Sequence, residues 1–554
     1  MITIDIRKSE HTIEEYSIFV SFPYDADIID VIREQYTRFW DNVTKEWELP
    51  LSSLETLVDR LHNYEITINA DENIFLTEEV KIPSGFKYKT KPFKHQEDCM
   101  IYGLKHNRWI LGDEQGLGKT KEVIDLAIAK KIQYGYKHCL ILCCVNGLKW
   151  NWKEEIAIHS NESGFILGER VNRKGRLVID GNKEKYGHLC NLPDDYFIIT
   201  NIESLRDAHI LNKLVELCET RQIEMIAIDE MHLRLSPASQ QGKSVLKLQA
   251  ETMIAMSGTP LMNSPLDLYT PLKWIGAETH TFNGFRQHYC EFGGYGDYEV
   301  VGYQNLEDLQ KLLESVMLRR RKSEVLDLPE KLYVKEYVEM TPKQAQIYKE
   351  VHSDICAHID QIKMSNNPLA EMIRLRQATG YTGILSSMIQ ESAKLDRMEE
   401  IVEESVANGK QIVIFSNWTQ ITNVVEERLS KYRVCTITGE VDDSYRQLIK
   451  NDFQAGKYDV LVGSTGAMGT GLTLTAATVE IFMDEPWNRA KKEQAEDRCH
   501  RTGTTENVTI YTLLTKGTID ERIHEIVYEK GEVADFLVDG EIKDKGALVD
   551  YLLS

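Results

Sequence analysis

The chain has 554 residues and a formal net charge of −22, because 87 acidic side chains outnumber 65 basic ones. At about 150 residues per domain, this length predicts three or four folding units. The negative charge argues against a protein that coats nucleic acid by bulk attraction, although it leaves room for a local basic channel. No apolar run reaches the roughly 18 residues of a membrane span, and the N-terminus lacks the pattern of a secretion signal. We therefore expect a cytoplasmic protein that is not secreted and has no membrane partner.

The first eighty residues are predicted to form a small α+β module. Alternating residues over Ser17–Phe22 indicate a strand, and a helical pattern follows over Ile28–Phe39. Residues 81–92 are polar and contain two prolines and a glycine, which is typical of a linker.

From Arg108 onward, short apolar runs alternate with helix-like stretches, a pattern that predicts a doubly wound parallel sheet. The expected strands are Trp109–Leu111, Leu140–Cys144, Phe197–Thr200, Ile226–Ile228 and Met253–Met256. Residues 266–390 are mostly helical in pattern and lack the rhythm of strands. The alternation then restarts, with expected strands at Ile412–Phe415, Val434–Ile437, Val460–Val462, Val479–Met483 and Val508–Leu513.

These patterns predict an α/β fold with two doubly wound parallel-sheet lobes in series. The expected division is an N-terminal domain over 1–80, a first lobe over 81–265, a helical insertion and linker over 266–390, a second lobe over 391–535 and a C-terminal tail over 536–554.

The strongest local signal is the glycine-rich loop Asp113–Thr120, which follows an expected strand and precedes a helical pattern. Gly116 and Gly118 would let backbone N–H groups approach phosphates, Lys119 would supply charge to the β- and γ-phosphates, and Thr120 a hydroxyl for Mg²⁺. An aspartate replaces the first glycine of the general pattern. By chance, a chain of this length would contain the pattern G-x-G-K-[ST] only roughly a few hundredths of a time. A chance match in a loop that merely caps a helix is therefore the less favoured interpretation.

A second signal is the pair Asp229 and Glu230, which ends an apolar strand. At the carboxyl edge of a sheet, beside a phosphate loop, Asp229 can hold Mg²⁺ through water and Glu230 can orient the attacking water. Alone, such a pair is usually a solvated turn. Because it follows a phosphate loop in a second βα unit, we favour the catalytic interpretation.

A third signal is the pair Arg498 and Arg501, which would share one face if the segment is helical. Two guanidinium groups on one face suit a γ-phosphate that arrives from another domain, the role of an arginine finger. By itself the segment is typical of a solvated charged helix, and only its place in the second lobe favours the finger.

These three elements, in this order, resemble the Swi/Snf family of superfamily-two helicase-like ATPases. The loop Asp113–Thr120 matches the family's D-E-x-G-L-G-K-T pattern, including the aspartate. Further segments that resemble family motifs are Phe93–Gln96, Leu148–Ile156, Ile199–Leu205, Ser257–Asn263, Met317–Lys322, Leu328–Lys331, Phe415–Trp418, Thr438–Gly439, Ser464–Thr475 and Glu485–Asn488. The match spans about residues 90–530.

The resemblance implies two RecA-like lobes with ATP and Mg²⁺ in the cleft between them. The implied catalytic residues are Lys119, Asp229, Glu230, Arg498 and Arg501, with Thr120 and Asp229 at the metal. The implied nucleotide-binding residues are Gln96, which would read adenine, and Asp113, Gly116, Gly118, Lys119, Thr120 and Gly471. The implied nucleic-acid contacts are Lys149, Thr200, Asn201, Thr438, Gly439, Thr465 and Trp487.

The implied function is a DNA-dependent ATPase that translocates on double-stranded or branched DNA and remodels DNA or protein–DNA structures, for example by fork remodelling or strand annealing. Because the sequence shows no histone-reading or zinc module, we expect a nucleoid-associated or virus-encoded protein. Two departures from the family pattern, Met231 in place of alanine and Gly503 before Thr504 in place of a Gly-Gln pair, remove no catalytic group. A strand-separating helicase on DNA or RNA and a catalytically inactive nucleic-acid or protein scaffold remain as alternatives. The intact ATP residues argue against the scaffold.

The N-terminal module resembles a HARP domain, which precedes the motor in fork-remodelling and strand-annealing members of the family. The residues that carry this resemblance are Phe22–Asp25, Phe39–Asp41, Trp47–Leu51 and Leu54. A small packing domain with ordinary core aromatics is the alternative. For Arg319–Lys322, contact with phosphates and a solvated helix end are equally favoured.

Overall fold

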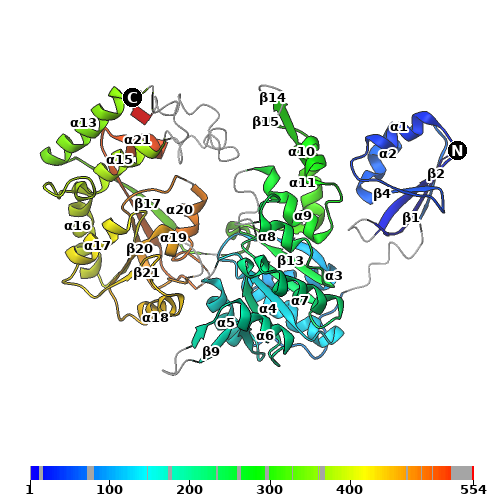
Figure 1. Ribbon diagram of the computed structural model, residues 1–554, viewed down its shortest axis with the longest axis horizontal. Helices are drawn as coiled ribbons and strands as arrows, with labels where there is room; N and C mark the ends of the chain where they lie inside the picture. Colours follow the sequence, from blue (N-terminus) through cyan, green and yellow to red (C-terminus); the bar gives the residue numbers. More distant parts are fainter. Residues whose placement is uncertain are drawn as a thin grey trace.

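The computed structural model describes residues 2–11, 16–70, 80–145, 147–171, 177–231, 235–258, 264–293, 299–326, 328–359, 361, 369–468, 472–487, 489–501, 503–525 and 552–553. Figure 1 shows three bodies in a row, with the N-terminal module at one end, the first lobe in the middle and the second lobe at the other end. Within the described residues, no helix is both long enough and apolar enough to cross a membrane.

The N-terminal module is a five-stranded sheet with two helices on one face. Its strand order is β3-β4-β2-β1-β5, formed by β1 (Ile2–Lys8), β2 (Tyr16–Ser21), β3 (Phe39–Asp41), β4 (Glu46–Pro50) and β5 (Ile66–Ala70). Helices α1 (Ala26–Glu34) and α2 (Leu54–Arg60) cover the core, which contains Ile4, Ile32 and Leu57. The helix predicted over Ile28–Phe39 is too long: Gln35 is already extended, and Phe39 begins a strand.

The module contacts the first lobe through Tyr36. Its ring stacks on His280 and His288, with centroid distances of 4.1 and 3.9 Å. Its hydroxyl donates to Glu278 Oε2 at 3.0 Å. Tyr36, which lies two residues after the end of α1, therefore connects the module to the first lobe.

The first lobe is a seven-stranded sheet, parallel throughout, with the order β16-β6-β13-β12-β7-β11-β8. The five predicted strands are confirmed as β6 (Arg108–Leu111), β7 (Cys139–Cys143), β11 (Phe197–Asn201), β12 (Met225–Asp229) and β13 (Thr252–Met256). Between them run α3 (Lys94–Lys105), α4 (Lys119–Tyr134), α5 (Leu148–His159), β8 (Gly164–Ile166), β9 (Glu169–Val171), β10 (Leu177–Ile179), α6 (Asn182–Cys190), α7 (Ala208–Glu219) and α8 (Gln240–Val245).

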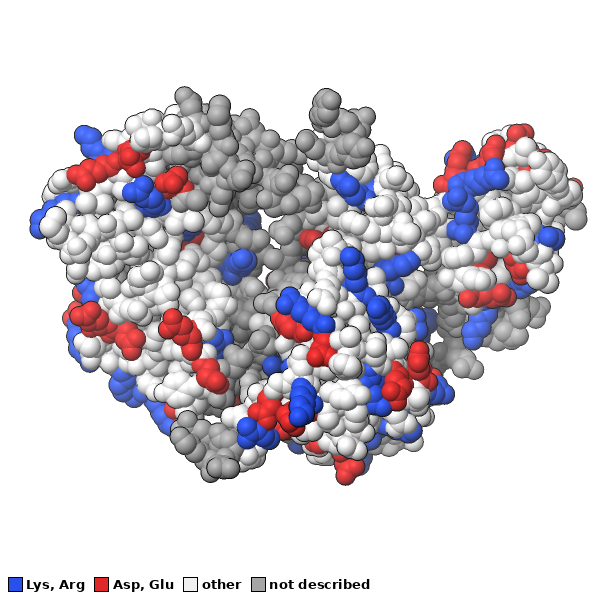
Figure 2. Space-filling model, viewed as in Figure 1, with Lys and Arg blue, Asp and Glu red and all other residues white. Residues whose placement is uncertain are grey.

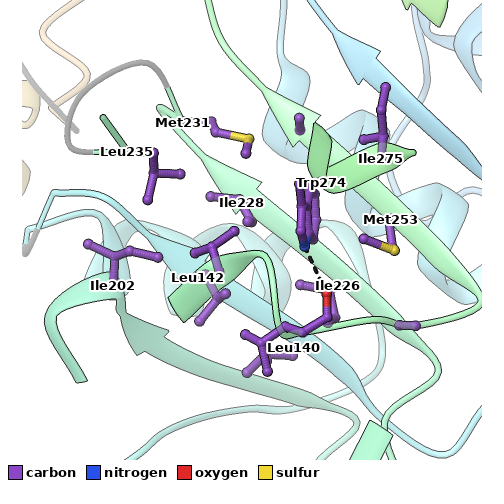
Figure 3. Packing of buried hydrophobic residues seen from close by; sticks show 14 of the residues in the cluster. Leu140, Leu142, Ile202, Ile226, Ile228, Met231, Leu235, Met253, Trp274 and Ile275 are labelled. Atoms are coloured by element: carbon purple, nitrogen blue, oxygen red, sulfur yellow. Dashed lines mark hydrogen bonds between the residues drawn. The ribbon is translucent and has the colours of Figure 1, made fainter. Parts of the chain in front are cut away.

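The core of this lobe explains why its strands were readable as apolar runs. Side chains of β7 and β12, such as Leu142 and Ile228, pack near Trp274 on one face of the sheet (Figure 3). The Trp274 indole N–H donates to the Leu248 carbonyl at 2.9 Å. The opposite face packs against a second core that includes Trp152. Both faces are buried, so the central strands are mostly apolar, with polar residues such as Thr252 and Asp229 at their ends.

The segment 266–390 is not purely helical, and the prediction that it lacks strands is wrong. It contains α9 (Tyr269–Ile275), α10 (Phe282–Tyr289), β14 (Cys290–Gly293), β15 (Glu299–Tyr303), α11 (Leu306–Val316), β16 (Met317–Leu318), α12 (Lys322–Val325), β17 (Lys331–Val338), α13 (Pro342–Ala357) and α15 (Leu369–Gly380). Strand β16 joins the first sheet and β17 the second. The first has two residues and the second is a half-exposed edge strand with charged residues, so neither gives an apolar run.

The second lobe is a six-stranded parallel sheet with the order β17-β22-β21-β18-β20-β19. The five predicted strands are confirmed as β18 (Gln411–Ser416), β19 (Val434–Ile437), β20 (Val460–Ser464), β21 (Ala477–Phe482) and β22 (Val508–Thr515). Its helices are α16 (Ala393–Ala407), α17 (Thr419–Arg428), α18 (Asp443–Gln454), α19 (Thr465–Met468), α20 (Arg489–Glu496) and α21 (Ile519–His524). The α/β fold with two parallel-sheet lobes is therefore confirmed. The tail predicted over 536–554 lies outside the described residues except for 552–553.

Candidate nucleotide site between the lobes

A cavity of about 320 Å³ lies where the two lobes meet. The first lobe lines it with Gln96, Gly116, Gly118, Lys119, Thr120, Asp229 and Glu230, and the second with Thr473, Arg498 and Arg501. The three sequence signals, each more than a hundred residues from the next, thus converge on one cavity. This convergence is what a nucleotide site split between two lobes requires.

The glycines of the loop are required by its backbone and by its neighbours. Gly116 and Gly118 have φ of +86° and +89°, values that side chains other than glycine rarely adopt. A Cβ at Gly118 would lie 2.5 Å from the Gln96 amide nitrogen, and one at Gly116 would lie 2.9 Å from the Arg501 Cβ. The loop leads into α4, whose first residue, Lys119, donates to the Asp113 carbonyl at 2.8 Å. The backbone N–H groups at the start of a helix that follows such a loop fit phosphate oxygens.

Gln96 lies on the first turn of α3 and borders the cavity. Its Oε1 accepts the Phe93 N–H at 3.1 Å, and its Nε2 donates to the Leu117 carbonyl at 3.2 Å. The amide is thereby held to the backbone at both ends, which fixes its orientation beside the phosphate loop.

Asp229 and Glu230 stand at the carboxyl end of β12, as predicted. The Trp152 indole N–H donates to Asp229 Oδ2 at 2.8 Å. Burial, with a smaller contribution from the charge of Glu230, raises the pKa of the Asp229 carboxyl to about 6. Glu230 has φ of +53°, a left-handed conformation that costs a non-glycine residue on the order of 1–3 kcal/mol. A strained, buried carboxylate pair of this kind is typical of a functional site.

Arg498 and Arg501 do not lie on a helix, so the prediction of a shared helix face is wrong. Helix α20 ends at Glu496, and the arginines follow in turns. The Arg498 carbonyl, which a continuing helix would use internally, accepts the Leu474 N–H at 2.8 Å. Both side chains nevertheless line the cavity, where Arg501 Nη1 donates to Thr473 Oγ1 at 2.9 Å. Burial lowers the pKa of Arg498 to about 10 and lowers that of Arg501.

Sequence reasoning missed Gln115, which bridges the lobes. Its Oε1 accepts from Arg498 Nη2 at 2.8 Å, and its Nε2 donates to Glu230 Oε1 at 3.4 Å. It occupies the variable position of the loop pattern, so no motif marks it. Asp113, by contrast, was predicted to bind nucleotide but lies behind the loop, fully buried and paired with Arg320.

The predicted nucleic-acid contacts are more buried than expected. Each of Lys149, Thr200, Asn201, Thr438 and Thr465 exposes 8% or less of its surface. Gly439 is exposed and Trp487 is half-buried. All seven contacts with nucleic acid therefore stay predictions, and burial makes direct contact least accessible at the five buried residues. Gly471, which was predicted to bind nucleotide, lies outside the described residues.

Lys185, for which the sequence predicted no role, contacts the predicted nucleic-acid residues of the first lobe. Its Nζ donates to Asn201 Oδ1 at 3.1 Å and to Ser204 Oγ at 2.8 Å. Burial and the charge of Lys149 lower the pKa of Lys185 to about 8. On the face seen in Figure 2, the described basic side chains are interspersed with acidic ones and form no continuous basic surface.

Comparison with known proteins agrees with this geometry. The model of the SNF2-related domain matches residues 51–391, which is more than half of the chain. The chain belongs to the SNF2-related family. The model of the helicase conserved C-terminal domain matches residues 393–503 of this SNF2-related chain. The resemblance to the Swi/Snf family is thereby confirmed, and the resemblance of the N-terminal module to a HARP domain stays a prediction.

Several curated proteins are similar to this SNF2-related chain. An uncharacterized ATP-dependent helicase of Mycoplasma pneumoniae is 28% identical over 78% of this chain and 40% of its own length. The DNA annealing helicase and endonuclease ZRANB3 of Mus musculus is 26% identical over 82% of this chain and 41% of its own. The chain thus spans about two fifths of the length of these relatives. A Caenorhabditis elegans homolog of SWI/SNF-related matrix-associated actin-dependent regulator of chromatin subfamily A-like protein 1 is 25% identical over 92% of this chain and 73% of its own.

Among solved structures, the Sulfolobus solfataricus SWI2/SNF2 ATPase core in complex with dsDNA matches with 23% identity and a TM-score of 0.37. The match covers 83% of this chain and 95% of that one.

Proposed function

We propose that this protein hydrolyses ATP in the cavity between its lobes and uses the energy to translocate along double-stranded DNA. The observation that carries the proposal is that the phosphate loop, the Asp229–Glu230 pair and two arginines from the other lobe line one cavity. Membership of the SNF2-related family supports the same activity.

The residues fit ATP and Mg²⁺. The loop N–H groups and Lys119 would hold the β- and γ-phosphates, while Thr120 and Asp229 would hold Mg²⁺, which neutralises charge that develops on the phosphates. Glu230 would orient the attacking water. Arg498 and Arg501 would stabilise the charge of the transferring group.

DNA stimulation follows from the split site. Arg498 and Arg501 act only when the second lobe is held against the first, so a ligand that bridges the lobes raises the fraction of competent molecules. We expect slow hydrolysis alone and strong stimulation by duplex DNA.

Lys119→Ala tests the site. Removing the charge that neutralises the transferring phosphate should abolish nearly all DNA-stimulated turnover. Lys105→Ala, at an exposed position at the end of α3, is the matched control and should keep wild-type turnover. Wild-type turnover in the Lys119 variant would overturn the proposed active site.

Triplex displacement tests translocation. A duplex translocase should displace a third strand in an ATP-dependent way and leave a tailed duplex largely paired. Efficient unwinding of the tailed duplex without triplex displacement would instead favour a strand-separating helicase. Because counterion release must drive an acidic protein onto DNA, binding should also fall steeply with salt.

We further propose that residues 1–80 direct the motor to branched or partly single-stranded DNA. The mouse ZRANB3 relative is named a DNA annealing helicase. Two aromatic side chains of the module support a stacking role, because Tyr24 is 88% and Trp40 43% exposed. Trp47 packs against the module core and is less suited to it.

The test compares stimulation by forked and linear DNA. A chain that begins near Pro83, without the module, should hydrolyse ATP but lose its preference for forks and its strand annealing. Tyr24→Ala should weaken the preference with the core intact, while Val43→Ala, at a position 89% exposed in the same module, should not. A fork preference that is equal in the full-length, truncated and Tyr24→Ala proteins would mean that the module only braces the first lobe.

A further inference from the structure

The segment that joins the two lobes runs directly beside the phosphate loop. Strand β16 pairs with β6, the strand that leads into the loop. The Gly112 N–H then donates to the Leu318 carbonyl at 2.8 Å, and the Glu114 N–H to the Arg320 carbonyl at 3.0 Å. This inter-lobe segment, residues 317–322, which we call the joint, is therefore hydrogen-bonded to the loop backbone before the chain continues to the second lobe.

Side chains of the joint alternate between solvent and interior. Arg319 and Arg321 are exposed, whereas Arg320 and Lys322 turn inward. The two interpretations offered by the sequence, a phosphate contact and a solvated helix end, are therefore both wrong for Arg320 and Lys322, which are committed to ion pairs.

Arg320 binds the base of the phosphate loop. Its Nε donates to both carboxylate oxygens of Asp113 at 3.1 Å, and its Nη2 to Glu122 Oε1 at 2.9 Å. Its Nη1 donates to the carbonyl of His95, the neighbour of Gln96. Asp113 and Glu122 are buried, so the guanidinium holds two desolvated carboxyl groups at the loop and the first turn of α4.

Lys322, two residues on, binds the arginine segment of the other lobe. Its Nζ lies 2.5 Å from Asp497 Oδ1 and donates to the His500 carbonyl at 3.2 Å. Asp497 directly precedes Arg498, and His500 directly precedes Arg501. The Lys322 N–H also donates to Glu114 Oε2 at 2.7 Å, so the residue contacts both lobes.

We propose that Arg320 and Lys322 are positioning residues that set where the two arginines stand relative to the phosphate loop. This inference rests on the proposed ATP site. Arg320 holds the joint against the phosphate loop. Lys322, two residues on, holds the segment that contains Arg498 and Arg501 against the joint, so the two arginines are placed relative to the loop. Because a displacement of about 1 Å in a reacting geometry can cost roughly 10²-fold in rate, a short buried connection of this kind governs turnover without touching nucleotide.

The primary test is Lys322→Met in the full chain, measured as the kcat and KM of DNA-stimulated hydrolysis and as the affinity for a fluorescent ATP analogue. We expect kcat to fall roughly 10-fold or more and nucleotide affinity to change less than about threefold. Lys322→Arg, which keeps the charge, should recover most of the turnover. Arg320→Met should behave like Lys322→Met, and Arg320→Lys should recover part of its loss because one donor can still reach Asp113.

The controls come from the same segment. Arg319→Met and Arg321→Met remove a charge of the same kind from the exposed positions and should keep wild-type kcat at saturating DNA. Asp497→Asn breaks the Lys322 contact from the other side. Because Asp497 Oδ1 also accepts from Lys331 Nζ at 3.0 Å, Asp497→Asn alone should lose at least as much turnover as Lys322→Met. The loss in the double variant should be smaller than the sum of the two single losses, since both single changes remove the contact between Lys322 and Asp497.

A distance measurement separates positioning from general destabilisation. Cys190 on α6 and Cys356 on α13 are exposed and the other eight cysteines are buried, so spin labels report one distance between the lobes. With DNA and a non-hydrolysable ATP analogue bound, the Lys322→Met distribution should be broader than that of the wild type. If the charge-removing variants fold poorly, Arg320→Lys, which keeps only part of the contact with Asp113, should show the broader distribution instead, and Lys322→Arg should keep the width of the wild type.

Three results would overturn the inference: Lys322→Met with wild-type kcat, a loss of nucleotide affinity in proportion to kcat, or an unchanged distance distribution. Failure of the proposed function is recognised separately, because it would appear as wild-type turnover that survives Lys119→Ala.

Discussion

Replacing Asp229 by asparagine should stabilise the protein while it abolishes hydrolysis. The carboxyl is fully buried, and burial raises its pKa from 3.8 to about 6. A pKa that is higher in the folded than in the unfolded chain means that ionisation opposes folding. The contribution of the protonated Asp229 carboxyl to the free energy of unfolding is therefore fully present below pH 3.8 and is lost as pH rises through about 6. A shift of about two units corresponds to about 3 kcal/mol at pH 8, and linkage reduces this to about 1.5 kcal/mol at pH 5.

Asparagine removes this charge and keeps an oxygen that can accept the Trp152 N–H. The assay is denaturant unfolding of the wild type and of Asp229→Asn in EDTA, at pH 8 and pH 5, together with DNA-stimulated hydrolysis in Mg²⁺. The variant should gain about 2–3 kcal/mol at pH 8 and about half of that at pH 5, with turnover lost. Asp194→Asn, at an exposed site, is the control. A variant no more stable than wild type at pH 8, or a gain that does not shrink at pH 5, would refute the reasoning.

Three further variants are informative. Arg501→Ala should keep nucleotide binding and lose roughly 10³-fold or more in turnover, because the guanidinium acts on the transferring group; affinity that falls in proportion to turnover in a titration would place it in binding instead. Trp152→Phe removes a hydrogen bond that lowers the pKa of Asp229, so the acid limb of the pH–rate profile should move to higher pH, and an unmoved limb would contradict the role of Asp229. Tyr36→Ala removes ring contacts with His280, His288 and Tyr289, worth about 0.5–1.5 kcal/mol each for aromatic pairs, so small-angle X-ray scattering should show a more extended molecule while ATP hydrolysis persists; an unchanged scattering profile would mean that other contacts hold the module.

The sequence predicted the two sheets well because their central strands are buried on both faces. Every expected strand of the lobes, from Trp109–Leu111 to Val508–Leu513, is present. The failures are at the edges of the sheets. β8 has three residues and β16 two, so both are too short to give a pattern, and β17 mixes exposed and charged side chains.

Site residues could be predicted from the sequence where the chemistry of the reaction restricts the residue type. They could not be predicted where the role of a residue depends on a side chain that lies far away in the sequence. Lys119, Asp229 and Arg501 belong to recognisable patterns, and the structure brings them to one cavity. Gln115 stands at the variable position of the loop pattern, and Arg320 lies in a segment that resembles a family motif but carries no single predicted role. Each is defined by side chains more than a hundred residues away, and a single sequence carries no signal for such pairs. The fork preference and the side-chain contacts with DNA stay predictions.

The strands β16 and β17 belong to different sheets but are separated by only twelve residues, 319–330. At no more than about 3.3–3.6 Å per residue, this tether reaches about 40 Å. If the lobes separate, the tether still keeps the attachment point of one lobe within that distance of the attachment point of the other. A short tether of this kind gives an effective concentration on the order of millimolar. The two halves of the ATP site therefore meet as parts of one molecule, at a rate that dilution of the protein does not change.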